Sequence, residues 1–467
     1  MTQSLHELPA TALIDHYRHK TLSPVEVTRA VLERIDAWEP QIHATYACEP
    51  ETALQMARES ELRWRRGEPQ GPLDGVPVTI KENLATRGVP VPLGSAATEL
   101  VPATADSPPV ARLREAGAVF VSKTTMPDFG MLLASLSSFH GPTHNPWDVT
   151  RDTGGSSSGA GAAAAAGYGP LHLGSDIGGS IRQPAGLCGV FGFKPSLGRV
   201  PIDPPYTGRV AGPMTRTVAD AALMMRVLSL PDARDHMSLP YQPIEWTQLE
   251  RDVRGLRIGL WLDAGNGLSV DPDVRRAVHD AAVRFEAAGA IVEPLDSWIA
   301  PGMLEGMGRF FCMRVRRDLD RLPKGRQARV SQPIKRAIAT THGLSGEEIY
   351  DAYAQMFALR AATVAATRAF DYVLSPVFPM PAFEPERLFD AANGVHPALL
   401  SAFTSVFNYS EQPAASVNCG YSAQGLPIGL QIAGRRFDDL GVLQMARWWE
   451  RVRPAQRPWP EPVKEAV

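Results

Sequence analysis

Two glycine-rich segments stand out near the middle of the chain: Gly154-Gly155-Ser156-Ser157-Ser158-Gly159 and Gly174-Ser175-Asp176-Ile177-Gly178-Gly179-Ser180-Ile181-Arg182. Thirteen of the 45 residues from Gly154 to Gly198 are glycine, so much of this stretch can adopt positive φ and let the backbone approach a ligand. Serine hydroxyls surrounded by free backbone amides are typical of sites for acyl transfer. The segment therefore predicts a reactive serine.

The composition is that of an ordinary globular protein, with 467 residues, 44% of them hydrophobic, and a formal net charge of -3. This charge balance offers no basic surface for nucleic acid or for an anionic membrane, so neither partner is expected. The four cysteines are widely spaced and include no CxxC pair, which favours reduced thiols in a cytoplasmic protein. The N-terminus lacks the pattern of a signal peptide, and no apolar run approaches the ~20 residues of a membrane span.

Strands and helices alternate along most of the chain, which predicts an α/β fold with a sheet flanked by helices. Residues 9–40 have helical patterns, and Ser23-Pro24-Val25-Glu26 supplies a helix start with a capping box. A buried strand is expected to end at Lys81, and a helix, a glycine stop and a strand follow one another in 110–123. Further strands are expected at 257–260 and within 425–432, with a closing helix through residue 450.

The length alone would allow two or three domains. The proline-rich stretch 231–243 is the best candidate linker, yet the strands on both sides look like parts of one sheet, so a single large domain of 1–467 is favoured. Within it we expect an N-terminal helical arm at 1–70, a catalytic core at 71–230 and the rest of the sheet with the pocket helices at 244–467. The charged residues of the helical region 303–370 are interpreted as a solvated helix face.

Gly155-Ser156-Ser157-Ser158-Gly159 also matches the GxSxG elbow of α/β-hydrolases, with Ser157 in the nucleophile position. That motif requires a strand directly before it, whereas residues 145–152 have the composition of a loop. No ordered Asp and His pair can be assigned downstream. The elbow interpretation is therefore disfavoured.

The order of Lys81, Ser156 and Ser180, with the glycines around both serines, resembles the amidase signature family. The resemblance covers almost the whole chain and includes three further segments: Lys123-Thr124-Thr125-Met126-Pro127-Asp128-Phe129-Gly130, Gly192-Phe193-Lys194-Pro195-Ser196-Leu197-Gly198-Arg199 and Gly425-Leu426-Pro427-Ile428-Gly429-Leu430-Gln431. It implies one large domain in which helices cover both faces of a central mixed β-sheet.

The same resemblance implies roles for the site residues. Ser180 is the nucleophile, Ser156 is a bridging serine held by an unusual cis peptide after Gly155, and Lys81 is the base. The backbone amides of Ile177, Gly178, Gly179 and Ser180 would surround the oxyanion, while Asp176 and Arg182 would brace the loop without reacting.

Elementary chemistry agrees with these roles, because a serine hydroxyl is a poor nucleophile until a neighbour accepts its proton. A lysine can accept it only when neutral, so the pKa of Lys81 must fall by roughly 3 units from its usual ~10.4. Such a shift needs burial, and Val76, Val78 and Ile80 beside Lys81 are consistent with it.

The substrate is expected to be a small to medium, largely apolar amide, with esters or carbamates also open to acyl-serine chemistry. Apolar residues at Met126, Phe129 and Met131, together with Gly130, would line the pocket, although core packing explains them equally well. A subunit that supplies ammonia to misacylated tRNA is the alternative, which Glu411 and Asn418 mildly disfavour because they replace glycine and proline of the usual pattern.

No cofactor and no metal are expected, because the histidines show no ligand spacing. His140, His144 and His172 are interpreted as loop or core residues, and Cys188 as a packing thiol. A homodimer is plausible on general grounds.

Overall fold

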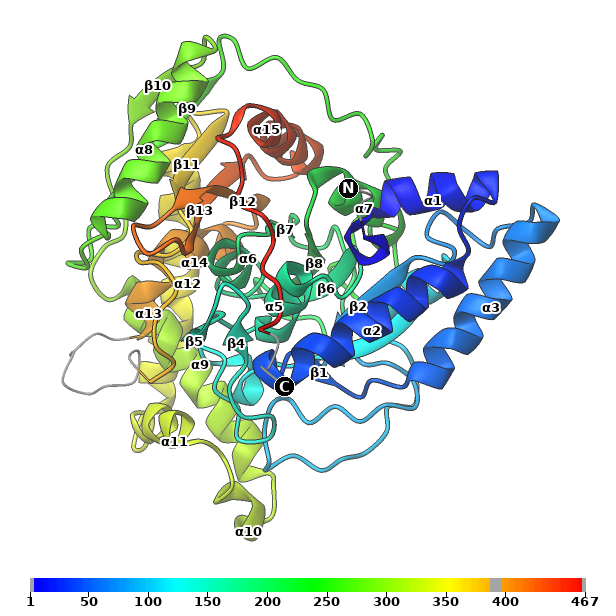
Figure 1. The fold of residues 1–467 in the computed structure, drawn as a ribbon. Helices are drawn as coiled ribbons and strands as arrows, with labels where there is room; N and C mark the ends of the chain where they lie inside the picture. Colours follow the sequence, from blue (N-terminus) through cyan, green and yellow to red (C-terminus); the bar gives the residue numbers. More distant parts are fainter. Residues whose placement is uncertain (1–3, 387–396, 464–467) are drawn as a thin grey trace.

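In the computed structural model, which describes residues 4–386 and 397–463, one sheet of eleven strands organises the chain (Figure 1). Its strand order is β1-β3-β2-β6-β8-β7-β12-β13-β11-β9-β10, and β4 and β5 form a separate pair. The strands are β1 Thr45–Tyr46, β2 Pro77–Lys81, β3 Val119–Thr124, β4 His144–Asn145, β5 Asp148–Asp152, β6 Leu171–Asp176, β7 Phe191–Lys194, β8 Val210–Thr215, β9 Arg257–Leu260, β10 Ile291–Pro294, β11 Tyr372–Pro376, β12 Ala414–Tyr421 and β13 Pro427–Gly434.

The sheet is mixed. Strands β3, β2 and β6 run parallel to one another, as do β11, β9 and β10, and the strands between these two groups pair in antiparallel fashion. The stretch 231–243 contains neither helix nor strand, and it leads from β8 and α7 toward β9 of the same sheet. The prediction of one α/β domain with a mixed sheet is therefore confirmed.

Helices cover both faces of the sheet, as predicted. The helices are α1 Ala10–His19, α2 Pro24–Ile42, α3 Pro50–Arg66, α4 Pro108–Glu115, α5 Ser158–Ala166, α6 Arg182–Cys188, α7 Val218–Leu228, α8 Pro272–Ala287, α9 Met303–Asp320, α10 Lys324–Gln327, α11 Gln332–Ala339, α12 Gly346–Thr367, α13 Pro397–Leu400, α14 Ala402–Tyr409 and α15 Asp439–Val452, with 3-10 turns η1 Leu5–Glu7 and η2 Asp128–Gly130. None of these helices combines the length and the hydropathy that a membrane span requires.

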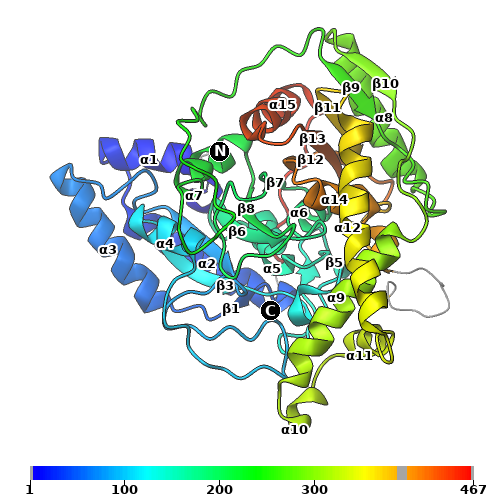
Figure 2. The ribbon, with the colours of Figure 1, turned by 180° about the vertical axis from the view of Figure 1, so that it is seen from behind.

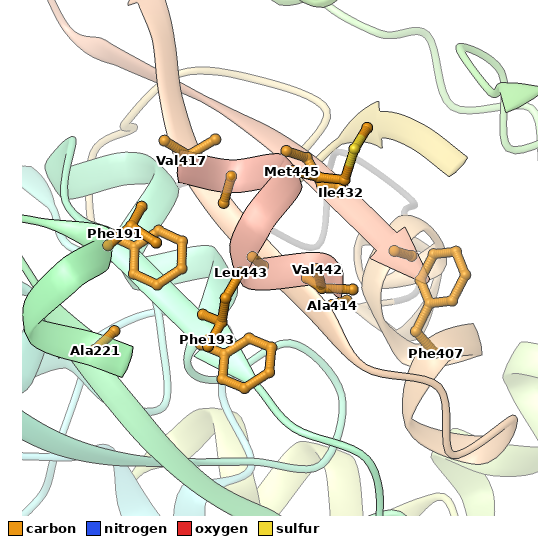
Figure 3. Packing of buried hydrophobic residues seen from close by; sticks show 14 of the residues in the cluster. Phe191, Phe193, Ala221, Phe407, Ala414, Val417, Ile432, Val442, Leu443 and Met445 are labelled. Carbon is orange, nitrogen blue, oxygen red and sulfur yellow. The ribbon is translucent and has the colours of Figure 1, made fainter. Parts of the chain in front are cut away.

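Strand β13 shows how the two faces differ. Ile428, Leu430 and Ile432 belong to the large apolar core, where α7 and α15 pack on the sheet (Figure 3). The intervening residues face α6: Gly429 approaches Gly186, and Gln431 accepts a hydrogen bond from Arg182. Because side chains alternate along a strand, one face of the sheet builds the core and the other carries the helices of the glycine-rich segments.

The local predictions at the N-terminus are confirmed. Ser23 caps α2: its hydroxyl accepts from the backbone N–H groups of Val25 and Glu26, and Ser23 N donates to the Glu26 carboxylate. Helix α2 packs against α3 and α5 (Figure 1).

Helices α9 and α12 lie side by side at one edge of the molecule, with α10 and α11 between them in the chain (Figure 2). The interpretation of their charges as a solvated face is only partly right. Arg317 and Asp318 are exposed, but Arg314 is half-buried and stacks on Tyr206 and Phe311. The helix turns Arg314 toward the core because it lies three residues after Phe311, on the same side.

Two sequence expectations need correction or explanation. Residues 145–152 are not a loop throughout, since β4 and β5 pair through them. Glu411, which occupies a usual glycine position, has a φ of 63° and its carboxylate pairs with Arg360 and Arg436. These two ion pairs hold the side chain in place at a backbone conformation that favours glycine.

Candidate active site

Strand β2 carries Lys81 into the interior at its last residue. All five residues of β2 are buried, and the Lys81 side chain is fully enclosed. Its Nζ donates to Ser156 Oγ at 2.8 Å and to the Ser175 carbonyl at 3.3 Å. Both partners are neutral, so the hydrogen bonds do not require a positive charge on the lysine.

Burial holds the pKa of Lys81 well below its usual range. The Asp176 carboxylate opposes this effect, while the positive charge of Arg209 adds to it. The side chain can therefore be a neutral amine, with a lone pair that accepts a proton, at a pH where an exposed lysine is charged.

The loop before Ser156 is held by a buried carboxylate. Asp152 accepts from Gly154 N at 2.6 Å and from the Ser135 hydroxyl at 2.9 Å, and burial raises its pKa to about 7. The peptide bond between Gly155 and Ser156 is cis, as expected. A Cβ on Gly155 would lie 2.4 Å from the Leu132 carbonyl oxygen, so only glycine fits there.

Ser180 lies beside this loop. Ser157 N donates to the Ser180 carbonyl at 3.1 Å, which joins the two glycine-rich segments next to Ser156. Ser180 is 5% exposed, and in 4–386 and 397–463 its hydroxyl finds no hydrogen-bond partner. A nearly buried hydroxyl left without a partner is available to a bound substrate.

A buried ion pair braces the turn that carries Ser180. Asp176 accepts from Gly179 N at 2.8 Å, from Ile181 N at 3.1 Å and from two nitrogens of Arg182 at 3.1 and 3.0 Å. Burial alone would raise the pKa of Asp176, but the Arg182 guanidinium holds it well below its usual range. Arg182 also donates to Asn408 Oδ1 at 2.6 Å, so α14 is tied into the same network.

Of the four backbone amides expected to bind the oxyanion, three are free to donate to a substrate. Within the described residues, the N–H groups of Ile177, Gly178 and Ser180 have no acceptor, and a Cβ on Gly178 would project into open space. The Gly179 amide departs from the prediction, because it donates to Asp176. Its φ of 128° turns the N–H back toward the carboxylate that braces the loop.

The predicted pocket residues have different surroundings. Gly130 borders the site directly, because a Cβ there would lie 3.3 Å from Ser156 Oγ and 3.1 Å from Met126 Cε. Phe129 and Met131 instead pack into a cluster that includes Val315 of α9. Helix α9 therefore packs near Phe129 and Met131, and Gly130 is the predicted pocket residue that borders Ser156.

Ser157 is engaged elsewhere. It is fully buried, and its hydroxyl donates to the Ser175 carbonyl at 3.1 Å. Two of the three serines in the segment thus have different environments: Ser156 faces Lys81 and Ser157 faces β6. This geometry gives no support to Ser157 as an elbow nucleophile.

The sequence did not reveal several residues that shape this region. Asp152 and Asn408 hold the two loops, Thr404 Oγ1 donates to the Gly178 carbonyl at 2.7 Å, and Arg209 acts on Lys81 through its charge. These residues stand outside the motifs around the serines, and their relation to Ser156 and Ser180 depends on the folded chain.

The remaining histidines and cysteines have structural environments. His172 is buried and pairs with Thr79 at 2.8 Å, and burial lowers its pKa to about 3. All four cysteines are free, as expected, and burial raises the pKa of the Cys188 thiol well above its usual range. These groups are poorly suited to nucleophilic or proton-transfer chemistry.

One group of side chains in 4–386 and 397–463 has the spacing of a metal site. The ligand atoms of His6, Glu7 and Glu461 lie within 4.8 Å of one another. Glu461 is largely exposed and is paired with Arg34, whose positive charge would compete with a cation. None of the three residues contacts Lys81, Ser156 or Ser180.

Comparison with known proteins identifies the family of this chain. The sequence profile of the Amidase family matches residues 26–443. The chain is 36% identical to an acylamidase of Rhodococcus erythropolis over 97% of each chain, and 36% identical to a glutamyl-tRNA(Gln) amidotransferase subunit of Carboxydothermus hydrogenoformans over 96% of this chain and 97% of that one. The crystal structure of a bacterial aryl acylamidase of the amidase signature family superimposes with a TM-score of 0.87 at 29% identity, covering 96% of this chain and 97% of the other. The chain therefore belongs to the amidase signature family of amide-hydrolysing enzymes.

Proposed function

We propose that this protein hydrolyses a small to medium, largely apolar carboxylic amide through a covalent acyl-Ser180 intermediate. The observation that carries the proposal is the 2.8 Å contact between Lys81 Nζ and Ser156 Oγ at a fully buried lysine. Such a lysine serves as a base because it is desolvated, and the serine beside it relays the proton.

In the first step, Ser180 Oγ attacks the carbonyl carbon of the amide. Its proton passes to Ser156, and the proton of Ser156 passes to the neutral amine of Lys81. The charge on Lys81 thus appears only as the tetrahedral intermediate forms. The negative charge of Asp176 favours protonated Lys81, so it stabilises the tetrahedral intermediate in which Lys81 carries the proton.

The carbonyl oxygen becomes negative in the same step. The free amides of Ile177, Gly178 and Ser180 are the donors available to it, and losing one such donor typically costs about 3 to 4 kcal/mol of transition-state stabilisation. The Gly179 amide is excluded from this role because Asp176 already binds it. Asp176 and Arg182 hold the donors in place before the substrate arrives.

The intermediate collapses when the departing amine takes a proton from Lys81 through Ser156. A water molecule then attacks the acyl-serine, with the same relay accepting and returning its proton. An ester or a carbamate can enter this cycle as well, because both present a carbonyl with a leaving group to the same nucleophile.

The surroundings of the serines support a largely apolar substrate. Met126 and Ser156 both lie close to Gly130. The Tyr409 hydroxyl donates to the Ile177 carbonyl at 3.4 Å, and the Phe311 ring lies 6.4 Å from the Tyr409 ring. The similarity to an acylamidase and to an aryl acylamidase points to amides of this kind.

A second candidate function is that of a component of a tRNA-dependent amidotransferase. It is favoured by the 36% identity to the glutamyl-tRNA(Gln) amidotransferase subunit over nearly the full length. A component of this kind works with partners, whereas a free hydrolase is active alone. The two functions therefore differ in what the purified chain does by itself.

The experiment is to measure amine or ammonia release by the purified chain from aliphatic, aryl and carbamate substrates and from glutamine. Ser180→Ala and Lys81→Ala are measured in parallel. We expect turnover of apolar amides by the wild type alone and loss of turnover in both variants. Inactivity of the folded wild type with every amide, or activity only with glutamine and an added partner, would overturn the hydrolase proposal.

A further inference from the structure

Two arginines near the site have no anionic partner. Arg209 lies just before β8, and Arg314 lies on α9. In the part of the chain that the structure describes, neither has a carboxylate within 4.0 Å; the Arg209 guanidinium donates to the Pro204 carbonyl at 2.8 Å, and Arg314 Nε is buried without any hydrogen-bond partner. Other half-buried arginines of this chain, such as Arg63 and Arg114, pair with an aspartate.

Both arginines contact Tyr206. Arg209 N donates to the Tyr206 carbonyl at 3.0 Å, and the Arg314 guanidinium carbon lies 5.0 Å from the centre of the Tyr206 ring. Tyr206 therefore contacts Arg209 through its backbone carbonyl and Arg314 through its ring. Phe311, one turn before Arg314, lies 6.4 Å from the ring of Tyr409.

Tyr409 then connects this group to the reacting centre. Its hydroxyl donates to the carbonyl of Ile177, whose own amide is one of the free donors in the loop. On the other side, the charge of Arg209 is close enough to Lys81 to lower its pKa. Arg209 thus lies near Lys81, and Arg314 is linked to the Ile177 carbonyl through Phe311 and Tyr409.

The positive charges of Arg209 and Arg314 destabilise each other when no anion is bound. Burial is the main cause that lowers the pKa of Arg209 to about 10, and the positive charge of Arg314 contributes to it, while Asp203 opposes the effect from the surface. Like charges near one another repel, and water screens part of this repulsion because both side chains are only partly buried. A negative group bound between them would reverse this repulsion and would satisfy the free Arg314 Nε.

We propose that Arg209 and Arg314 bind a carboxylate that the substrate carries in addition to its scissile amide. Guanidinium groups bind carboxylates through paired N–H donors, which gives both affinity and orientation. Tyr206 and Phe311 flank the site, so an apolar or aryl body between the amide and the carboxylate would contact their rings. This inference rests on the proposed function and narrows its substrate class to anionic amides.

The test compares matched substrates that differ only in a carboxylate. Succinanilate and butyranilide differ on the acyl side, and 4-acetamidobenzoate and acetanilide differ on the amine side. The measured quantity is the ratio of kcat/KM for the anionic and the neutral member of each pair. We expect a ratio well above one for one of the two pairs in the wild type.

Arg314→Gln should lower that ratio by about 10- to 100-fold, the scale of a charge-assisted hydrogen bond. Arg317→Gln is the matched control, because Arg317 is exposed on the same helix, and it should leave the ratio unchanged. Arg209→Gln should lower the ratio too, and should also move the acid limb of the pH profile upward for the neutral substrate, since it removes a positive charge near Lys81.

The outcomes separate this inference from the proposed function. Turnover of neutral amides with ratios near one for both pairs, in the wild type and in Arg314→Gln, would overturn the carboxylate site and leave the hydrolase intact. If no anilide is turned over, calorimetric binding of succinanilate and of 4-acetamidobenzoate to Ser180→Ala decides. Weaker binding of either anion after Arg314→Gln supports the site, and equal or absent binding contradicts it.

Discussion

Lys81 Nζ lies 2.8 Å from Ser156 Oγ, at the end of a strand in which every residue is buried. The strand fixes the lysine from one side, and the loop held by Asp152 fixes the serine from the other. Neither side chain can leave this contact without disturbing the interior. The relation explains how a residue that is normally charged can act as a base.

The rate should depend on pH through Lys81. Because burial lowers the pKa of Lys81, kcat/KM should rise with pH along an acid limb whose midpoint lies far below the pKa of free lysine. Lys81→Arg should reduce kcat by about 10²- to 10⁴-fold or more, since arginine stays protonated and general-base catalysis is of that size. A pH profile of the wild type that is flat down to pH 4 would contradict this role.

The burial of Lys81 should also lower the free energy of unfolding. The folded pKa is lowered, so between it and the unfolded value of about 10.4 the unfolded chain binds a proton that the folded chain does not. The folded state therefore loses stability as the pH falls below about 10.4. Each unit by which folding lowers the pKa of Lys81 reduces the free energy of unfolding by about 1.4 kcal/mol.

Lys81→Met should consequently abolish activity and raise the free energy of unfolding at pH 7 by roughly 1 to 3 kcal/mol. The gain should shrink as the pH rises toward about 10, where the unfolded wild-type chain begins to lose the Lys81 proton. Denaturant titrations at pH 7 and pH 10 measure it. A variant that is less stable than the wild type at pH 7 would show that the lysine is not buried at such a cost.

Gly155 should tolerate no side chain. In Gly155→Ala the new Cβ would meet the carbonyl oxygens of Leu132 and Ala134 at 2.4 and 2.8 Å, and backbone atoms cannot move aside. We expect loss of activity with destabilisation of about 2 kcal/mol or more. Gly178→Ala is the control for folding, because its Cβ would meet nothing within 4 Å; thermal unfolding should separate the two variants clearly.

The ion pair between Asp176 and Arg182, which holds the turn of Ser180, should depend on the negative charge of Asp176. Asp176→Asn removes the carboxylate that accepts from Arg182 and leaves a fully buried guanidinium without its ion pair. Breaking a buried pair in this way typically costs about 3 to 5 kcal/mol, and the amides of the loop should lose their alignment. Asp252→Asn removes an exposed pair with Arg254 and should change neither unfolding nor kcat. Equal effects of both variants would contradict the bracing role.

The sequence predicted much of the architecture because its local signals agree. The capping box at Ser23 and the strand that ends at Lys81 are short-range patterns, and the structure confirms both. The sheet order could not be predicted, because pairs such as β8 with β6 and β7 with β12 join segments far apart in the chain. The pairing of β4 with β5 was missed because residues 145–152 include an asparagine, a proline and two aspartates, which are depleted in strands.

The candidate site could be predicted from the sequence only where a reactive residue type occurs at a recognisable spacing. Lys81, Ser156 and Ser180 stand in recognisable motifs, whereas Arg209 and Arg314 stand in none. The Gly179 amide illustrates a different limit: glycine can turn its N–H either way, and only the position of Asp176 determines that it points to the carboxylate.

Covalent labelling tests the central claim most directly. A fluorophosphonate that reacts with activated serines is incubated with the wild type and with Lys81→Met across a range of pH, and the modified peptide is located by mass spectrometry. The account predicts that Ser180 alone is labelled, at a rate that follows the acid limb of turnover, and that Lys81→Met is not labelled. Labelling of Ser157, or labelling of Ser180 at the same rate in both proteins, would contradict it.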